Sequence, residues 1–141
     1  MSAVSYLIDT SAAARLLISD EHDVRWQEAL SNGLVAICDL TEIEILYSAR
    51  SRSDRAAKRD RLYRLFNWAP TPEGVFVRAR EVQRLLTDHG EHRSAGPVDL
   101  LVAATAELSG TTLLHYDRDF ETIARHTRQA VCWLAEPGSV K

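Results

Sequence analysis

Four acidic side chains stand at positions where carboxylates could act together. Asp9 and Asp117 each directly follow an apolar run, whereas Glu44 and Asp99 each fall in the first turn of an expected helix. Carboxylates that crowd together repel one another, and a divalent cation removes that penalty. Oxygen ligands suit Mg²⁺ or Mn²⁺. The set therefore indicates a cation site that would orient a water and hydrolyse a phosphodiester bond.

Neighbouring residues could assist these acids or account for them differently. Asp119 is an accessory fifth acid, and the hydroxyls of Thr10 and Ser11 could bond a carboxylate or a cation-bound water. Each acid also has a purely structural interpretation. Asp9 could cap a helix, Asp99 could stabilise the start of its helix through the macrodipole, and Asp117 and Asp119 could belong to a turn or a cap. For the second acid, two capping boxes compete, Thr41-x-x-Glu44 and Asp39-x-x-Glu42.

The surrounding elements predict why the four acids should meet. Apolar runs at 4–8, 34–38, 111–116 and 130–134 are expected strands. Helices are expected at 11–18, 23–30, 41–49 with a continuation up to Pro70, 73–89, 97–109 and 120–126. This alternation predicts an α/β fold, a three-layer α/β/α sandwich around a parallel sheet of four to five strands. Strand ends and helix starts then bring the acids to the carboxyl edge of the sheet.

Composition indicates one globular domain. The 141 residues are 45% hydrophobic and 26% charged, without repeats or linkers. We expect a domain over 1–135 and a loose tail over 136–141. No segment resembles a signal peptide or a membrane span. Cys38 and Cys132 lie in apolar segments and are expected to be buried, reduced thiols of a cytoplasmic protein.

The formal net charge is −3, but basic residues concentrate between positions 50 and 64. This segment has seven basic side chains and only two acidic ones. One interpretation is a solvated helix whose charge only keeps it soluble. The alternative is a surface that guides a nucleic-acid backbone, with Arg50, Arg55 and Arg59 as candidates.

Four motifs, in order, carry a family resemblance. They are Tyr-Leu-Ile-Asp9-Thr-Ser-Ala, Thr41-Glu-Ile-Glu44-Ile-Leu-Tyr-Ser48, Arg93-Ser-Ala-Gly-Pro-Val-Asp99 and Leu-Leu-His-Tyr-Asp117-Arg-Asp119-Phe120. Together they resemble the PIN-domain ribonucleases, and most of all the VapC toxins of bacterial toxin–antitoxin pairs. The resemblance covers nearly the whole chain.

This resemblance implies that Asp9, Glu44, Asp99 and Asp117 bind the cation, with Asp119 accessory. It favours Glu44 over Glu42, which helical periodicity alone leaves undecided. His115 departs from the family pattern, which usually has Thr or Ser there. It could order the nearby carboxylate, change the pH response or have no effect, and we favour no effect.

The resemblance also implies a homodimer, inhibition by a cognate antitoxin, and structured RNA substrates such as transfer or ribosomal RNA. Arg93 could clamp a phosphate or simply face solvent. The basic segment could instead dock an acidic or apolar antitoxin segment, with Leu62, Leu65 and Trp68 as anchors.

Three rival functions remain open. A metal-dependent phosphatase would usually carry Asp-x-Asp after the first strand, whereas this chain has Asp9-Thr-Ser. A nuclease without metal would use histidines and the RNA 2′-hydroxyl. A binding module that has lost catalysis would keep the fold and leave RNA intact.

Overall fold

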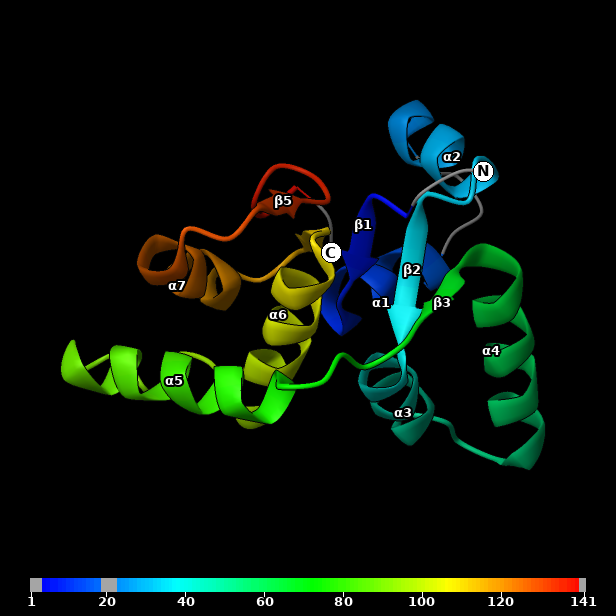
Figure 1. Cartoon of the computed structure of the whole chain (residues 1–141). Coiled ribbons are helices and arrows are strands. Elements are labelled where there is room, and N and C mark those ends of the chain that lie inside the picture. The colour runs from blue at the N-terminus through cyan, green and yellow to red at the C-terminus, as the bar shows by residue number, and fades with distance from the viewer. Residues whose placement is uncertain (1–3, 19–22, 140–141) are drawn as a thin grey trace.

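Five parallel strands form one sheet in the computed structural model, which describes residues 4–18 and 23–139 (Figure 1). The strand order is β3-β2-β1-β4-β5, so the chain crosses over at β1, in the middle. Register is continuous across the centre, where Tyr6 pairs with Val35 on one side and with Thr112 on the other. The strands are β1 (Tyr6–Ile8), β2 (Val35–Cys38), β3 (Asn67–Ala69), β4 (Thr112–His115) and β5 (Val131–Trp133).

Consecutive residues of the central strands point to opposite faces of the sheet, and both faces are buried. Leu7 and Leu113 belong to one apolar cluster, whereas Ile8 and Leu114 belong to the other. All four side chains are at most 1% exposed. This is why each of the central strands is a nearly continuous apolar run in sequence.

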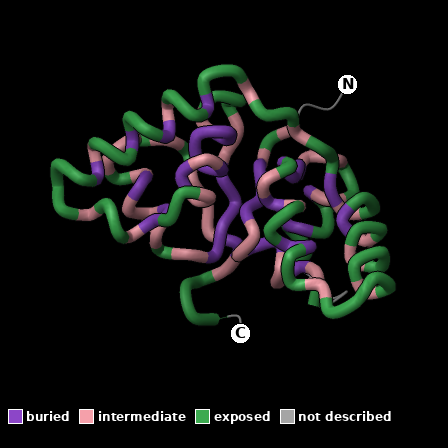
Figure 2. Tube along the Cα trace, turned by 90° about the horizontal axis from the view of Figure 1, so that it is seen from below, coloured by how far each residue is buried: buried purple, intermediate pink, exposed green. Residues whose placement is uncertain are grey.

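Seven helices within the described residues surround the sheet. Buried side chains of α5, α6 and α7 join the cluster with Leu7, whereas those of α1, α2 and α4 join the cluster with Ile8. The helices are α1 (Thr10–Ile18), α2 (Val24–Ser31), α3 (Asp39–Tyr47), α4 (Arg52–Leu65), α5 (Val75–Asp88), α6 (Pro97–Ser109) and α7 (Arg118–Thr127). The three-layer α/β/α prediction is therefore confirmed, and Figure 2 shows the buried residues concentrated between the layers.

Two predictions about elements were wrong. The strand β3 was missed because its residues are mostly exposed at the sheet edge, where no apolar pattern marks them. The helix expected to run on from position 41 is broken after Tyr47, and α4 begins anew at Arg52. Ser51 caps this second helix, its hydroxyl accepting a bond from the Asp54 amide at 3.1 Å.

Exposed residues follow the last strand. Residues 136–139 form a turn in which the Ser139 amide donates to the Glu136 carbonyl at 3.0 Å. Residues 140–141 of the expected tail lie outside the described residues, so the domain boundary at 135 stays a prediction. No helix in the part of the chain described is long and apolar enough to cross a membrane.

Candidate active site

Asp9 lies at the carboxyl end of β1 and is only 4% exposed. Its carboxylate accepts hydrogen bonds from the backbone amides of Ser11 and Ala12, both at 3.1 Å, so it caps α1. Burial, with a smaller contribution from the charge of Asp99, nevertheless raises the pKa of Asp9 to about 6. Capping alone thus leaves a buried negative charge that a cation would stabilise.

Ser11 links this acid to the neighbouring strand. Its hydroxyl lies 2.7 and 2.9 Å from the two carboxylate oxygens of Asp9. The same oxygen accepts a hydrogen bond at 2.8 Å from the backbone amide of Tyr116, just beyond β4. Ser11 therefore fixes the Asp9 carboxylate relative to the end of β4.

Asp99 is the acid whose pKa is affected by the charges of three other acids. It stands in the first turn of α6, which begins at Pro97 as expected for that residue type. Burial is the main cause that raises its pKa to about 6. Repulsion from other acids adds to this effect, and their identities show that the predicted set faces one region: Asp117, Glu44 and Asp119, in decreasing order.

The structure distinguishes the two glutamates of α3. Glu44 accepts a hydrogen bond from the hydroxyl of Thr10, and its charge acts on Asp99. Glu42 points instead toward α4, where it accepts a bond from the Tyr63 hydroxyl at 3.1 Å. Neither expected capping box forms, because α3 begins at Asp39 and its N-cap residue makes no side-chain capping bond.

Asp117 follows β4 and is the N-cap residue of α7. Its carboxylate accepts a hydrogen bond from the Asp119 amide at 2.9 Å. Burial and the charge of Asp117 both raise the pKa of Asp119. The Asp117 amide in turn donates to Nδ1 of His115 at 3.2 Å. The other ring nitrogen, Nε2, lies 3.2 Å from Glu121.

His115 is fully buried, and burial lowers its pKa. Since Nδ1 accepts a hydrogen bond from the Asp117 amide, Nε2 carries the hydrogen of the neutral ring and donates a hydrogen bond to Glu121. The ring also packs between Phe120 and Trp133. His115 therefore bonds the backbone amide of Asp117, and the expectation that this residue has no effect on function stays a prediction.

The donor set fits a hard divalent cation. All the side chains that converge on Asp99 are carboxylates, and the raised pKa values of Asp9 and Asp99 show that their charge lacks compensation. As the side chains stand, no three His, Cys, Asp or Glu residues among those described lie close enough together to hold a metal ion. Cation binding therefore requires the facing carboxylates to close in, which their mutual repulsion opposes when no cation compensates it.

Arg93 lies on a different segment from the other basic candidates, which lie on α4 or just before it. Arg93 is exposed in the loop before α6, whereas Arg50 and Arg55 are exposed at the beginning of α4. Arg59 is bonded to neighbouring side chains: its Nε donates to the Tyr63 hydroxyl at 3.1 Å and lies 3.9 Å from a carboxylate oxygen of Glu42.

The docking anchors and the cysteines expected from the sequence differ in their burial. Leu62 is wholly buried and cannot serve as a docking anchor, whereas Trp68 is 57% exposed. Cys38 is buried as predicted, but Cys132 is only half-buried, and both thiols are free. The expected burial of Cys132 failed because β5, an edge strand, is half-exposed along its length.

Two residues near the acids had no signal in the sequence. Arg15 donates to the Ser11 carbonyl at 2.6 Å, and its guanidinium lies 4.4 Å from the centre of the Tyr116 ring. Glu121 is the partner of His115 described above. Both depend on packing between segments about 100 residues apart or on a turn geometry, which helical periodicity does not reveal.

Strand order and an acidic carboxyl edge define the PIN-domain class of α/β proteins. A family model of the PIN domain matches residues 6–126. The chain belongs to the PIN-domain family.

Two relatives that match over nearly their whole length are both named as VapC ribonucleases. Ribonuclease VapC21 of Mycobacterium tuberculosis (strain ATCC 25618 / H37Rv) is 45% identical over 139 residues, which covers 95% of this chain and 96% of that protein. Ribonuclease VapC18 of the same strain is 40% identical over 140 residues, covering 96% and 98%. The predicted resemblance to VapC ribonucleases is thus confirmed.

Solved structures confirm the fold. The crystal structure of DNA-bound VapBC from Salmonella typhimurium has a chain that matches with a TM-score of 0.77 at 17% identity, covering 94% of this chain and 99% of that one. A chain of DNA-bound VapBC2 from Rickettsia felis matches with a TM-score of 0.75, also at 17% identity, covering 94% and 98%.

Proposed function

We propose that this chain is a metal-dependent endoribonuclease that acts in the cytoplasm as the toxin of a toxin–antitoxin pair. The observation that carries this proposal is that Asp99 interacts electrostatically with Asp9, Glu44 and Asp117 at one edge of the sheet. Relatives named as VapC ribonucleases over their full length support the substrate class. The proposed substrate is structured RNA, such as transfer or ribosomal RNA.

Each acid has a part in the proposed mechanism. Asp9, Asp99 and Asp117 would hold Mg²⁺ or Mn²⁺, with Glu44 completing the set and Asp119 accessory. A bound divalent cation would supply Lewis acidity and a positive charge for the phosphate. Ser11 keeps the Asp9 carboxylate oriented, and Thr10 does the same for Glu44. Arg93, in the loop that leads to α6, would contact an RNA phosphate.

The groove between α3 and α4 is the proposed antitoxin site. It measures about 640 Å³, and its lining combines apolar and basic side chains: Ile43, Leu46, Tyr47, Tyr63, Arg55 and Arg59, together with Glu42. Ile43 and Tyr47 are 67% and 91% exposed. Exposed apolar side chains beside arginines suit a partner segment with apolar and acidic residues. VapBC from Salmonella typhimurium and from Rickettsia felis are complexes that support a protein partner. We further propose that the toxin is a homodimer.

Mapping the ends of cut RNA tests the proposed reaction. Purified protein with Mg²⁺ is expected to leave a 5′-phosphate and a 3′-hydroxyl, because water attacks in line with the leaving 3′-oxygen. Cutting through the 2′-hydroxyl would instead leave a 2′,3′-cyclic phosphate and would contradict the proposal. Intact RNA after prolonged incubation, in a preparation that binds Mg²⁺, would favour a binding module that has lost catalysis.

A further inference from the structure

A pocket of about 480 Å³ is lined by residues of α3, β3 and the end of α4. Its lining combines aromatic, acidic and amide side chains, namely Tyr63, Phe66, Trp68, Asp39, Glu42 and Asn67. None of these lining residues is basic, and none belongs to the proposed cation-binding acids. The pocket therefore joins negative charge to aromatic rings and lacks a positive charge among the described residues that line it.

The two acids of the pocket hold two of its aromatic rings. The indole Nε1 of Trp68 donates a hydrogen bond to Asp39 at 2.7 Å, and the hydroxyl of Tyr63 donates one to Glu42 at 3.1 Å. Both rings are nevertheless more than half exposed, at 57% for Trp68 and 55% for Tyr63. In each acid the second carboxylate oxygen has no hydrogen-bond partner among the residues that the structure describes. The pocket thus offers exposed rings and carboxylate oxygens side by side.

This combination of side chains suits an organic cation. The face of an aromatic ring attracts a lysine or arginine side chain that lies within about 6 Å of the ring centre. A carboxylate at the same place adds charge-assisted hydrogen bonds, which are roughly twice as strong as neutral ones. Because Asp39 is bonded to Trp68 and Glu42 to Tyr63, one cation can meet a ring and a carboxylate together.

Arg59 shows the same recognition within the chain. Its guanidinium lies 5.0 Å from the centre of the Tyr63 ring, and its Nε lies 3.9 Å from a carboxylate oxygen of Glu42. Arg59 lines the groove between α3 and α4 but not the pocket. The pocket presents Tyr63 and Glu42 again, now with Trp68 and Asp39, and its cation would come from a partner.

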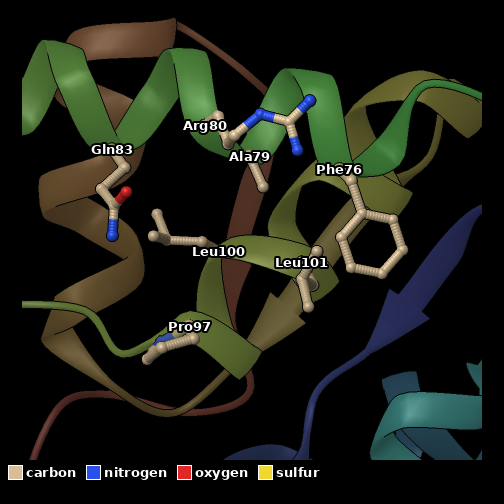
Figure 3. A pocket seen from close by; sticks show the side chains of 7 residues that line it. All are labelled: Phe76, Ala79, Arg80, Gln83, Pro97, Leu100 and Leu101. Carbon is tan, nitrogen blue, oxygen red and sulfur yellow. The ribbon is translucent and has the colours of Figure 1, made fainter.

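The cavity between α5 and α6 lacks this combination (Figure 3). It has one aromatic side chain, Phe76, and one basic side chain, Arg80. No acid is among the described residues that line it. An exposed aromatic ring alone therefore does not define a cation pocket, and Phe76 serves as a control for Trp68.

The pocket continues the proposed antitoxin groove. Glu42 and Tyr63 line both the groove and the pocket. The groove adds Arg55 and Arg59, which suit acidic residues of a partner, whereas the pocket adds Asp39, which suits a basic one. A single segment that runs from the groove into the pocket would meet both kinds of charge in turn.

We propose that the pocket between α3, α4 and β3 seats one arginine or lysine side chain of the antitoxin, against Trp68 and Tyr63 and bonded to Asp39 and Glu42. This proposal rests on the proposed antitoxin partner. It adds the position along the groove at which that partner carries a positive charge.

Titration with single amino acids tests the pocket without any partner protein. The probes are N-acetyl-arginine amide and N-acetyl-lysine amide, and N-acetyl-citrulline amide is the matched control because it resembles the arginine compound without the charge. At constant ionic strength, a basic probe is expected to shift the indole N–H signal of Trp68 saturably in NMR spectra of the full chain, and the citrulline compound is not. No saturable shift with either basic probe, or equal shifts with citrulline, overturns the proposal.

Variants locate the bound probe. Trp68→Ala should weaken its binding by roughly two- to 30-fold, the range for one cation–π contact, as followed by the backbone amide signals of α3 and α4. Asp39→Asn should weaken it too, whereas Asp60→Asn should not, because Asp60 is an exposed acid of α4 outside the pocket. Phe76→Ala should also bind normally, although Phe76 is 63% exposed. Equal effects of the pocket variants and their controls overturn the proposal.

Selection of phage-displayed random peptides on the full chain tests the partner. Peptides that Ile43→Ala no longer retains occupy the groove, and these should carry arginine or lysine at one fixed position and bind Trp68→Ala weakly. Groove-binding peptides without a fixed basic residue, retained by Trp68→Ala, overturn the pocket proposal alone. If no selected peptide depends on Ile43, the proposed antitoxin groove fails, and the role of the pocket in antitoxin recognition fails with it, whatever the amino acids show.

Discussion

The hydroxyl oxygen of Ser11 accepts a hydrogen bond from the backbone amide of Tyr116 at 2.8 Å. Ser11 is the second residue of α1, the helix that follows β1, whereas Tyr116 follows β4, which is the neighbouring strand in the sheet. Because the same hydroxyl bonds the Asp9 carboxylate, this contact ties one acid of the site to the segment that carries Asp117. The spacing of the acids thus depends on a serine as well as on the sheet.

Ser11→Ala tests this link. The substitution should lower the free energy of unfolding by about 1–3 kcal/mol, because the Tyr116 amide loses its partner. It should also raise the pKa of Asp9 further, since the Ser11 hydrogen bonds lower it. Chemical denaturation and carboxyl ¹³C NMR measure the two effects. Ser48→Ala is the control, because Ser48 is exposed and its hydroxyl donates to a carbonyl of its own helix. Equal losses in both variants would contradict the structural role of Ser11.

Asp9→Asn should make the metal-free protein more stable at neutral pH while reducing cleavage by at least about 100-fold. A carboxyl whose pKa is raised from 3.8 to about 6 on folding favours the folded state fully below pH 3.8. That contribution is lost as the pH rises through 6, at a cost of at most about 3 kcal/mol. The variant avoids this cost, so its advantage in thermal unfolding should grow from pH 4 to pH 7.5. A variant that cuts RNA normally would remove Asp9 from the site.

Glu44→Gln and Glu42→Gln form a matched pair on α3. Glu44 faces Thr10 and Asp99, so its neutral variant should lose about 10- to 100-fold in cleavage. Glu42→Gln should cut RNA at nearly the wild-type rate, because Glu42 contacts α4 through Tyr63. Initial rates at saturating Mg²⁺ decide between them, and the reverse order of effects would reassign the acid.

Mg²⁺ or Mn²⁺ should raise the melting temperature, since a cation that binds only the folded chain stabilises it by about 2.7 kcal/mol at 100 times its Kd. The effect should weaken below pH 6, where protons compete for Asp9 and Asp99. Differential scanning fluorimetry at pH 5.0 and 7.5 measures both changes. A flat response to millimolar metal at pH 7.5 would count against the cation site.

The parts of the fold that were predictable have strong local signals. The helix α6 was predicted with its observed bounds, because Pro97 suits a first helical position and Gly110 follows the last. Buried strands are continuous apolar runs, so their existence and their parallel arrangement follow from the sequence. From these two features we also predict that the four acids lie at one edge of the sheet.

The remaining features depend on contacts between distant segments. The strand β3 is mostly exposed and, among the strands that the structure describes, pairs with β2 alone, so nothing local distinguishes Asn67–Ala69 from a loop. Glu44 and Glu42 differ in the side chains that each of them contacts. Helical periodicity does not show these contacts. Likewise, the bonds of His115 to Asp117 and Glu121 exist only because a turn brings them together.

Anomalous scattering from Mn²⁺ in crystals of the full chain would show whether acids from four separate segments hold one cation. We expect a manganese peak within ligand distance of Asp9, Asp99 and Asp117, and loss of that peak in Asp99→Asn. Well-occupied manganese elsewhere, with these carboxylates left unligated, would contradict it.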